Sequence, residues 1–192
     1  TASHSLPNGY CLSNTGMTPL LPFLGTTGVA VDGSVQARHG WRDSAEYGGM
    51  VRLPETLWIR IVAHLTRALP EEGCGLLGFR SNTSRIATAF YGGRNIDRSP
   101  TRFTMDPESV LGALLDIEAH GWVLGAIVHS HPSGPATPSP TDLAEARYPG
   151  VLFGIVAMER VPPDIRFWRP APAREGNPTE VAWLLQPKET GG

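Results

Sequence analysis

Cysteine, long apolar runs and excess charge are all scarce in this 192-residue sequence, and each scarcity removes a class of protein. Two cysteines, Cys11 and Cys74, are too few for a disulfide framework or for a zinc site made of cysteine alone. No apolar run approaches the roughly 20 residues of a membrane-spanning helix. Residues 16–30 lack the features of a secretory signal, because no lysine or arginine precedes them and they contain two prolines. We therefore expect a cytoplasmic protein.

Neither positive nor negative charge dominates the sequence. The 16 basic and 18 acidic side chains leave a net charge of −2, and no basic cluster stands out. Nucleic-acid-binding domains usually carry such a cluster, so we expect no nucleic acid and no membrane among the partners. Apolar residues make up 41% of the chain, which is enough to build a sizeable core.

The composition of the chain changes at about residue 50. Residues 1–49 are rich in serine, threonine and glycine and follow neither a helical nor a strand period. We expect a flexible or disordered extension there, then one domain over residues 50–187 and a flexible C-terminus over residues 188–192. The chain begins without methionine, so either Met50 lies close to the true start or the extension is genuine.

Apolar spacing from residue 51 onward predicts alternating helices and strands. Residues 54–69 carry apolar side chains at helical spacing, with Pro54 in the first turn, and residues 105–120 contain the helix start Asp106-Pro107. Residues 122–129 form an apolar run that is typical of a central strand buried on both faces. The other expected elements are strands at 75–80, 85–91, 151–158, 165–169 and 181–185 and a short helix near 140–147. This order predicts a single α/β (α+β) domain with a central sheet between helices.

The segment with chemical character follows that central strand and reads HSHPSGPATPSPTD over residues 129–142. His129 and His131 lie two residues apart at a strand end, so both imidazoles point to one face. Asp142 follows a loop of proline and glycine and can fold back as a third, anionic ligand. Two histidines and one carboxylate form a ligand set typical of catalytic zinc, with the fourth position left for water.

The same segment has a purely structural interpretation. Ser139, Pro140 and Asp142 fit a helix capping box, in which Ser139 is the N-cap and Asp142 reaches back from the third position. Both roles use the same side-chain oxygens, so we expect a ligand Asp142 to be a poor capping partner. A His-x-His pair alone is also a weak signal for metal binding. The segment by itself therefore leaves both interpretations open.

The whole pattern resembles the signature of the JAMM (MPN-plus) zinc metalloproteases. In that signature His-x-His is followed after seven residues by Ser-x-x-Asp, as it is here from His131 to Asp142. The family also has an upstream glutamate, and residues 70–78 (PEEGCGLLG) resemble the corresponding stretch of its bacterial members. The family glutamate lies two positions before the Cys-Gly pair, which selects Glu72 over Glu71.

Two further segments narrow the resemblance. Residues 95–100 (NIDRSP) and 102–107 (RFTMDP) resemble the part before the central helix in bacterial Mec-like peptidases, which act on ubiquitin-like or sulfur-carrier proteins. The resemblance implies a cytidine-deaminase-like MPN/JAMM domain with a central mixed sheet. It also implies a partner protein that ends in Gly-Gly, after which the enzyme hydrolyses an amide bond. It leaves the oligomeric state open.

The resemblance assigns a role to each motif residue. His129, His131 and Asp142 would hold one Zn²⁺ per chain, and no other cofactor is implied. Glu72 would act as general base and then as general acid, and Ser139 would donate a hydrogen bond to the oxyanion. Amide hydrolysis needs a nucleophile, charge stabilisation and a proton for the leaving amine, and this set of residues covers all three.

Other interpretations remain open at this point. RadC-like MPN proteins linked to DNA repair also carry His-Pro-Ser-Gly, which is found here at residues 131–134. A non-catalytic MPN scaffold that binds partners would typically lack a ligand, whereas the set here is complete. Cys74 beside Glu72 is either a reactive thiol or a small buried core residue, and the second role is the more common one for an isolated cysteine.

Overall fold

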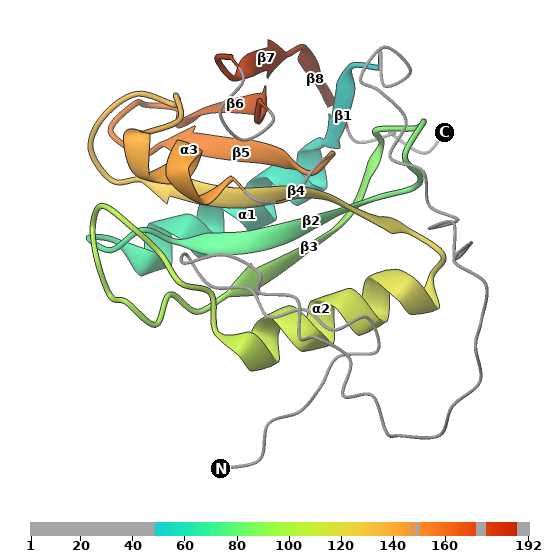
Figure 1. Ribbon diagram of the computed structural model, residues 1–192, viewed down its shortest axis with the longest axis horizontal. Coiled ribbons are helices and arrows are strands. Elements are labelled where there is room, and N and C mark those ends of the chain that lie inside the picture. Colours follow the sequence, from blue (N-terminus) through green and yellow to red (C-terminus); the bar gives the residue numbers. More distant parts are fainter. Residues whose placement is uncertain (1–48, 147, 149, 172–175, 188–192) are drawn as a thin grey trace, which may run out of the picture.

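The central feature of the fold is a six-stranded mixed sheet with helices on both faces, beside which lies a two-stranded sheet (Figure 1). The computed structural model describes residues 49–146, 148, 150–171 and 176–187. Apart from Gly49, the expected N-terminal extension and the expected flexible C-terminus lie outside the described residues. The arrangement confirms the α/β class and the central mixed sheet.

The main sheet has the strand order β3-β2-β4-β5-β6-β7, and β1 pairs with β8. Every neighbouring pair of the main sheet is antiparallel except β4 and β5, which are parallel. None of the helices among the described residues is both long and apolar enough to cross a membrane. The elements are β1 (Val51–Pro54), α1 (Glu55–Ala68), β2 (Cys74–Phe79), β3 (Ala87–Gly93), α2 (Pro107–Ala119), β4 (Val123–His131), α3 (Pro140–Glu145), β5 (Leu152–Ala157), β6 (Asp164–Arg169), β7 (Thr179–Val181) and β8 (Trp183–Gln186).

Helix α1 covers one face of the main sheet. Its buried side chains Leu57, Ile61 and Leu65 recur at helical spacing, as the apolar pattern predicts. They join the core cluster that contains Leu77 of β2 and Val128 of β4. Because strand side chains alternate, Ile127, His129 and His131 near the end of β4 point to the opposite face.

Helix α2 covers that opposite face. Its start was predicted correctly, because the Asp106 carboxylate accepts a hydrogen bond from the Ser109 backbone N–H at 3.2 Å and Pro107 follows directly. The helix ends before Gly121, whose φ of +65° suits a residue without a side chain. Val110 joins the core cluster that contains Ile127 of β4, so the face of β4 that carries Ile127 lies under α2.

The parallel pair β4–β5 needs a crossover connection, and this connection contains α3. The register pairs His129 with Ile155 and His131 with Ala157, so both histidines lie at the carboxyl end of the pair. A hydrogen bond joins the crossover to β6: the indole N–H of Trp168 in β6 donates to the carbonyl of Ala136 in the crossover at 2.8 Å. Open α/β sheets commonly bind ligands at this end of their parallel strands.

The structure corrects the expected elements at both ends of the domain. Strand β1 was not predicted, and Pro54, expected in the first helical turn, ends β1 and serves as the N-cap residue of α1. The single strand expected at 181–185 is two short strands, β7 and β8, separated by Ala182 and placed in different sheets. These strands have three or four residues, which is too short for alternation to be read from sequence.

Candidate metal centre

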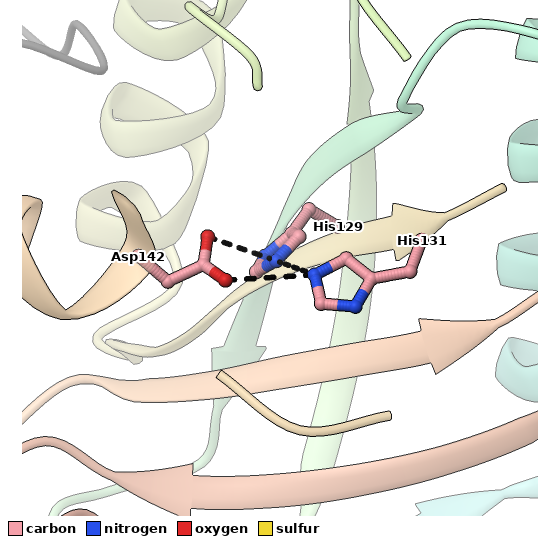
Figure 2. A group of neighbouring side chains, drawn as sticks. All are labelled: His129, His131 and Asp142. Atoms are coloured by element: carbon pink, nitrogen blue, oxygen red, sulfur yellow. Dashed lines mark hydrogen bonds and ion pairs between the residues drawn. The ribbon is translucent and has the colours of Figure 1, made fainter. Parts of the chain in front are cut away.

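Strand β4 carries His129 and His131 on one face, and Figure 2 shows the two rings turned toward the same spot. Their Nε2 atoms lie 3.3 Å apart, and both side chains are buried. The strand was expected to end at His129, but it continues through His131. This extension keeps the two-residue period intact across the pair, so the expected same-face arrangement is confirmed.

Asp142 reaches the histidines from the first turn of α3 (Figure 2). Its Oδ1 lies 3.3 Å from Nε2 of His129, and its Oδ2 lies 3.5 Å from Nε2 of His131. One potential ligand atom from each of the three residues lies within 4.8 Å of the others. The structure therefore brings together the three residues that were expected to bind a metal.

The capping box is also present, and it uses the same aspartate. The Ser139 backbone N–H donates to Asp142 Oδ2 at 2.7 Å, and the Asp142 backbone N–H donates to Ser139 Oγ at 3.2 Å. The cap does not prevent Asp142 from facing the histidines, because a carboxylate has two oxygens. Oδ2 completes the cap and lies 3.5 Å from Nε2 of His131, while Oδ1 faces His129. Metal binding by Asp142 stays a prediction. The cap holds the carboxylate in the orientation that the site needs.

The donor set fits a metal ion such as zinc. Nδ1 of His131 lies 2.8 Å from the Pro135 carbonyl oxygen, which can only accept a hydrogen bond. Nδ1 therefore carries the proton, and Nε2 presents a lone pair toward His129 and Asp142. Lone pairs of two imidazoles and a carboxylate at one spot repel one another unless a proton or a cation lies among them. Two nitrogens and one oxygen are ligands that zinc accepts.

The charges within the group favour a bound cation. Burial raises the pKa of Asp142, but the imidazoles of His129 and His131 lower it by more, so that pKa lies well below its ordinary range. Burial lowers the pKa of His131, but the Asp142 carboxylate and the Pro135 carbonyl raise it by more. Asp142 is therefore held in its charged form, which is the form that binds a metal.

Glu72 lies in the turn between α1 and β2 and is 4% exposed. The register pairs Cys74 with His129, and Ser130 exchanges hydrogen bonds with Gly73 at 2.8 and 2.9 Å. Glu72 lies two residues before Cys74, and His131 lies two residues after His129. Because β2 and β4 are antiparallel, Glu72 therefore lies alongside His131. Among the described residues, its buried Oε2 has no hydrogen-bond partner. The Glu72 carboxylate thus lies close enough to the three potential ligands to interact with their charges.

Burial raises the pKa of Glu72, and the charge of Asp142 adds to this effect. The two histidines act in the opposite direction but do not cancel it. A raised pKa brings the carboxyl group closer to neutral pH, where a group can both take up and release a proton. A raised pKa is a property that a general base needs, and the role of Glu72 as general base stays a prediction.

Ser139 lies at the edge of the same group, and its side chain is half-buried. Its Oγ accepts from the Asp142 backbone N–H, so the hydroxyl proton remains able to donate elsewhere. The thiol of Cys74 is completely buried, and burial together with the nearby Glu72 charge raises its pKa to about 12. A thiol of this kind is a core residue rather than a nucleophile.

Three further residues contribute to the site, although they are not among the residues that the sequence motif assigned to it. Ser130 holds Gly73 beside β4, Asn95 donates to the Glu72 carbonyl at 3.0 Å, and the ring of Phe103 stacks on His129 with centroids 5.0 Å apart. Ser130 could have been noticed as a polar residue inside an apolar strand. The partners of Asn95 and Phe103 are distant in sequence, so no local pattern identifies them.

Comparison with known proteins places this geometry in a family. The family model described as prokaryotic homologues of the JAB domain matches residues 54–171, which is more than half of the chain. All five motif residues lie within that span. A Thermus thermophilus protein named as a probable TtuB-protein conjugate cleaving protease is 41% identical over 111 residues, which cover 56% of this chain and 72% of the relative. The Haloferax volcanii desampylase is 34% identical over 85 residues, which cover 44% of this chain and 60% of the relative.

Solved structures agree with the fold. A Desulfitobacterium hafniense protein solved in solution has a TM-score of 0.64 and 32% identity, and the match covers 72% of this chain and 94% of that protein. A Salinibacter ruber protein has a TM-score of 0.51 and 25% identity, and the match covers 70% of this chain and 92% of that protein. The likeness therefore extends over nearly the whole of both solved chains.

Proposed function

Because the chain belongs to the prokaryotic homologues of the JAB domain and is a JAMM-type hydrolase, we propose that it is a zinc-dependent isopeptidase for conjugates of ubiquitin-like or sulfur-carrier proteins. The bond to be hydrolysed is the amide that follows a C-terminal diglycine. The observation that carries this proposal is the convergence of His129, His131 and Asp142 beside the buried Glu72. The names of the two relatives, a conjugate-cleaving protease and a desampylase, support the substrate class.

His129, His131 and Asp142 are the residues that would hold zinc. When bound, zinc supplies Lewis acidity, which polarises a carbonyl group and lowers the pKa of water. The chain itself orients the three ligands. The Pro135 carbonyl fixes the tautomer of His131, and the capping box fixes the Asp142 carboxylate.

Glu72 and Ser139 would carry out the remaining chemistry. Glu72 takes a proton from the attacking water and later delivers it to the leaving amine, for which its raised pKa is suited. The Ser139 hydroxyl donates to the oxyanion that forms on the scissile carbonyl. A diglycine tail suits a site among buried residues, because glycine has no side chain to exclude.

The test is hydrolysis of a ubiquitin-like protein that is extended beyond its Gly-Gly, followed by mass measurement. We expect cleavage directly after the second glycine, and we expect Glu72→Gln to abolish it while about one zinc per chain is retained. Glu71→Gln changes the neighbouring, less buried glutamate and is the matched control, which should retain activity. Full activity of Glu72→Gln would remove the proposed base. A zinc-loaded wild-type protein that cleaves no such substrate would overturn the function.

A further inference from the structure

Asn95 is a buried amide that joins the loop before α2 to the turn that carries Glu72. Its side chain is 7% exposed and makes four hydrogen bonds. Nδ2 donates to the carbonyls of Glu72 and Arg102 at 3.0 and 3.1 Å. Oδ1 accepts from the backbone N–H groups of Asp97 and Thr104 at 3.0 and 3.2 Å. Both donors and both acceptor positions of the amide are therefore used.

The chemistry of the partners fixes how this amide is oriented. Two of the partners are carbonyl oxygens, which can only accept, and the other two are backbone N–H groups, which can only donate. The opposite orientation of the Asn95 amide would place oxygen against oxygen and nitrogen against nitrogen. Among the natural side chains of this size, only asparagine offers two donors and two acceptors on one flat group.

The loop that Asn95 organises also binds the other side of the Glu72 peptide. The Glu72 backbone N–H donates to the Ser99 carbonyl at 2.8 Å. Arg98, directly before Ser99, has a φ of +49°, a conformation that costs energy for a residue with a side chain and persists where surrounding contacts hold it. The backbone N–H and C=O of Glu72 are thus both held by the loop, although Oε2 of its side chain has no partner among the described residues.

We propose that Asn95 is a positioning residue that holds the Glu72 peptide, and with it the carboxylate, beside His129 and His131, where Glu72 would take a proton from the attacking water. This inference rests on the proposed function, in which Glu72 moves the proton. Displacement of a reacting group by about 1 Å can lower a rate by about 100-fold. A backbone fixed at both its N–H and its C=O prevents such a displacement.

The test is Asn95→Asp, which keeps the shape and both acceptor bonds but replaces the donor to the carbonyls of Glu72 and Arg102 by an oxygen. We expect kcat to fall by about 100-fold with little change in KM, since substrate and zinc are bound by other residues. Zinc content should stay at about one per chain. In the metal-free protein, the backbone N–H groups of Glu72 and Gly73 should exchange with solvent faster than in wild type.

Thr104→Val is the matched control. It removes the hydrogen bond from Thr104 Oγ1 to Asp97 Oδ2, 2.8 Å long, within the same loop but leaves the contacts of Asn95 with Glu72 in place. We expect near wild-type kcat and unchanged exchange at Glu72. If Asn95→Asp does not fold, Asn95→Ala removes the same donor without adding charge and should show the same loss of kcat.

The outcomes separate this inference from the proposed function. Wild-type kcat in Asn95→Asp, or an equal loss in Thr104→Val, would overturn the positioning role. A wild-type protein that cleaves no conjugate would overturn the proposed function, and hydrogen exchange at Glu72 would then decide whether Asn95 holds this peptide. Unchanged exchange in Asn95→Asp would show that it does not.

Discussion

Glu72 and Asp142 are two buried carboxylates that face the same pair of imidazoles, yet their pKa values move in opposite directions. Asp142 accepts a backbone hydrogen bond and lies 3.3 Å from His129, and these contacts outweigh the cost of burying its charge. Oε2 of Glu72 has no such partner among the described residues, so burial dominates. One carboxylate is suited to hold a cation and the other to carry a proton.

The raised pKa of Glu72 predicts a specific pH dependence of stability. Between the ordinary pKa of 4.5 and the raised pKa, the folded chain holds a proton that the unfolded chain has released. Wild-type stability therefore falls as pH rises through this window. Glutamine does not titrate, so Glu72→Gln should gain stability relative to wild type as pH rises from 4.5 toward neutrality.

Thermal unfolding of chelator-treated protein at several pH values measures this difference. The midpoints of wild type and Glu72→Gln should move apart toward neutral pH. Glu71→Gln serves as the control for removing a glutamate at this turn. A constant or narrowing difference for Glu72→Gln would contradict the raised pKa.

At the scale of elements, the start of α3 combines helix formation with the site. Ser139→Ala removes the N-cap and should cost about 1 kcal/mol of stability. If the hydroxyl also supports the oxyanion, kcat should fall by about 100- to 1,000-fold, which is more than the lost cap explains. Denaturant unfolding and steady-state kinetics measure the two effects separately.

Ser139→Gly distinguishes the two roles of the serine, because glycine is tolerated at the N-cap at a cost of only a few tenths of a kcal/mol but has no side chain that could donate to an oxyanion. Stability should return toward the wild-type value, while kcat should stay low. Recovery of turnover in Ser139→Gly would mean that Ser139 acts through the cap alone.

Strand β4 carries both histidines, and its packing limits what it can tolerate. A Cβ added at Gly125 would overlap the ring of Phe79, so Gly125→Ala should destabilise the fold by about 1–3 kcal/mol. Gly112 lies in α2 with no heavy atom within 4 Å of an added Cβ. Gly112→Ala should therefore stabilise by about 0.5–1 kcal/mol. Denaturant midpoints test both, and a Gly125→Ala variant as stable as wild type would contradict the packing argument.

The elements that the sequence revealed are those with enough residues to show a period. Helices α1 and α2 are 14 and 13 residues long and have clear apolar faces, and β4 is a nine-residue apolar strand. The pairing of β1 with β8 joins residues from the two ends of the domain, such as Leu53 and Leu185. Such pairing depends on tertiary packing rather than on local preference, so it could not be predicted.

The residues of the candidate site also fall into two groups: those that a pattern in the sequence identifies and those that only the folded chain brings to the site. The strand period places His129 and His131 on one face, which is a local rule. The capping box favours a purely structural role for Asp142, and the resemblance to the family signature decides between the two interpretations. Asn95 acts on Glu72 across 23 residues of sequence, and this contact exists only in the folded chain. The two roles of Asp142 were expected to compete for its side-chain oxygens, but in the folded chain the carboxylate completes the cap and faces both histidines.

At the scale of the whole molecule, the site joins β4, α3 and the turn before β2, so metal binding should stabilise the fold. Zinc at about 100 times its dissociation constant would add about 2.7 kcal/mol if it binds the folded chain alone. We expect zinc to raise the Tm of chelator-treated protein by several degrees. His131→Gln removes one ligand and should abolish most of the rise, and an equal rise in that variant would place the zinc elsewhere.

Asp142 serves α3 and the site at once, and this limits how the sequence can change in length. A residue inserted between Ser139 and Asp142 would turn the carboxylate by about 100° around the helix and break the cap in the same step. Val161 lies in the turn between β5 and β6 and is 99% exposed, so insertions at this turn would disturb neither of the two strands. Over the course of evolution, insertions and deletions can therefore accumulate at that turn, whereas the two-residue gap before Asp142 must stay constant for as long as the site is used.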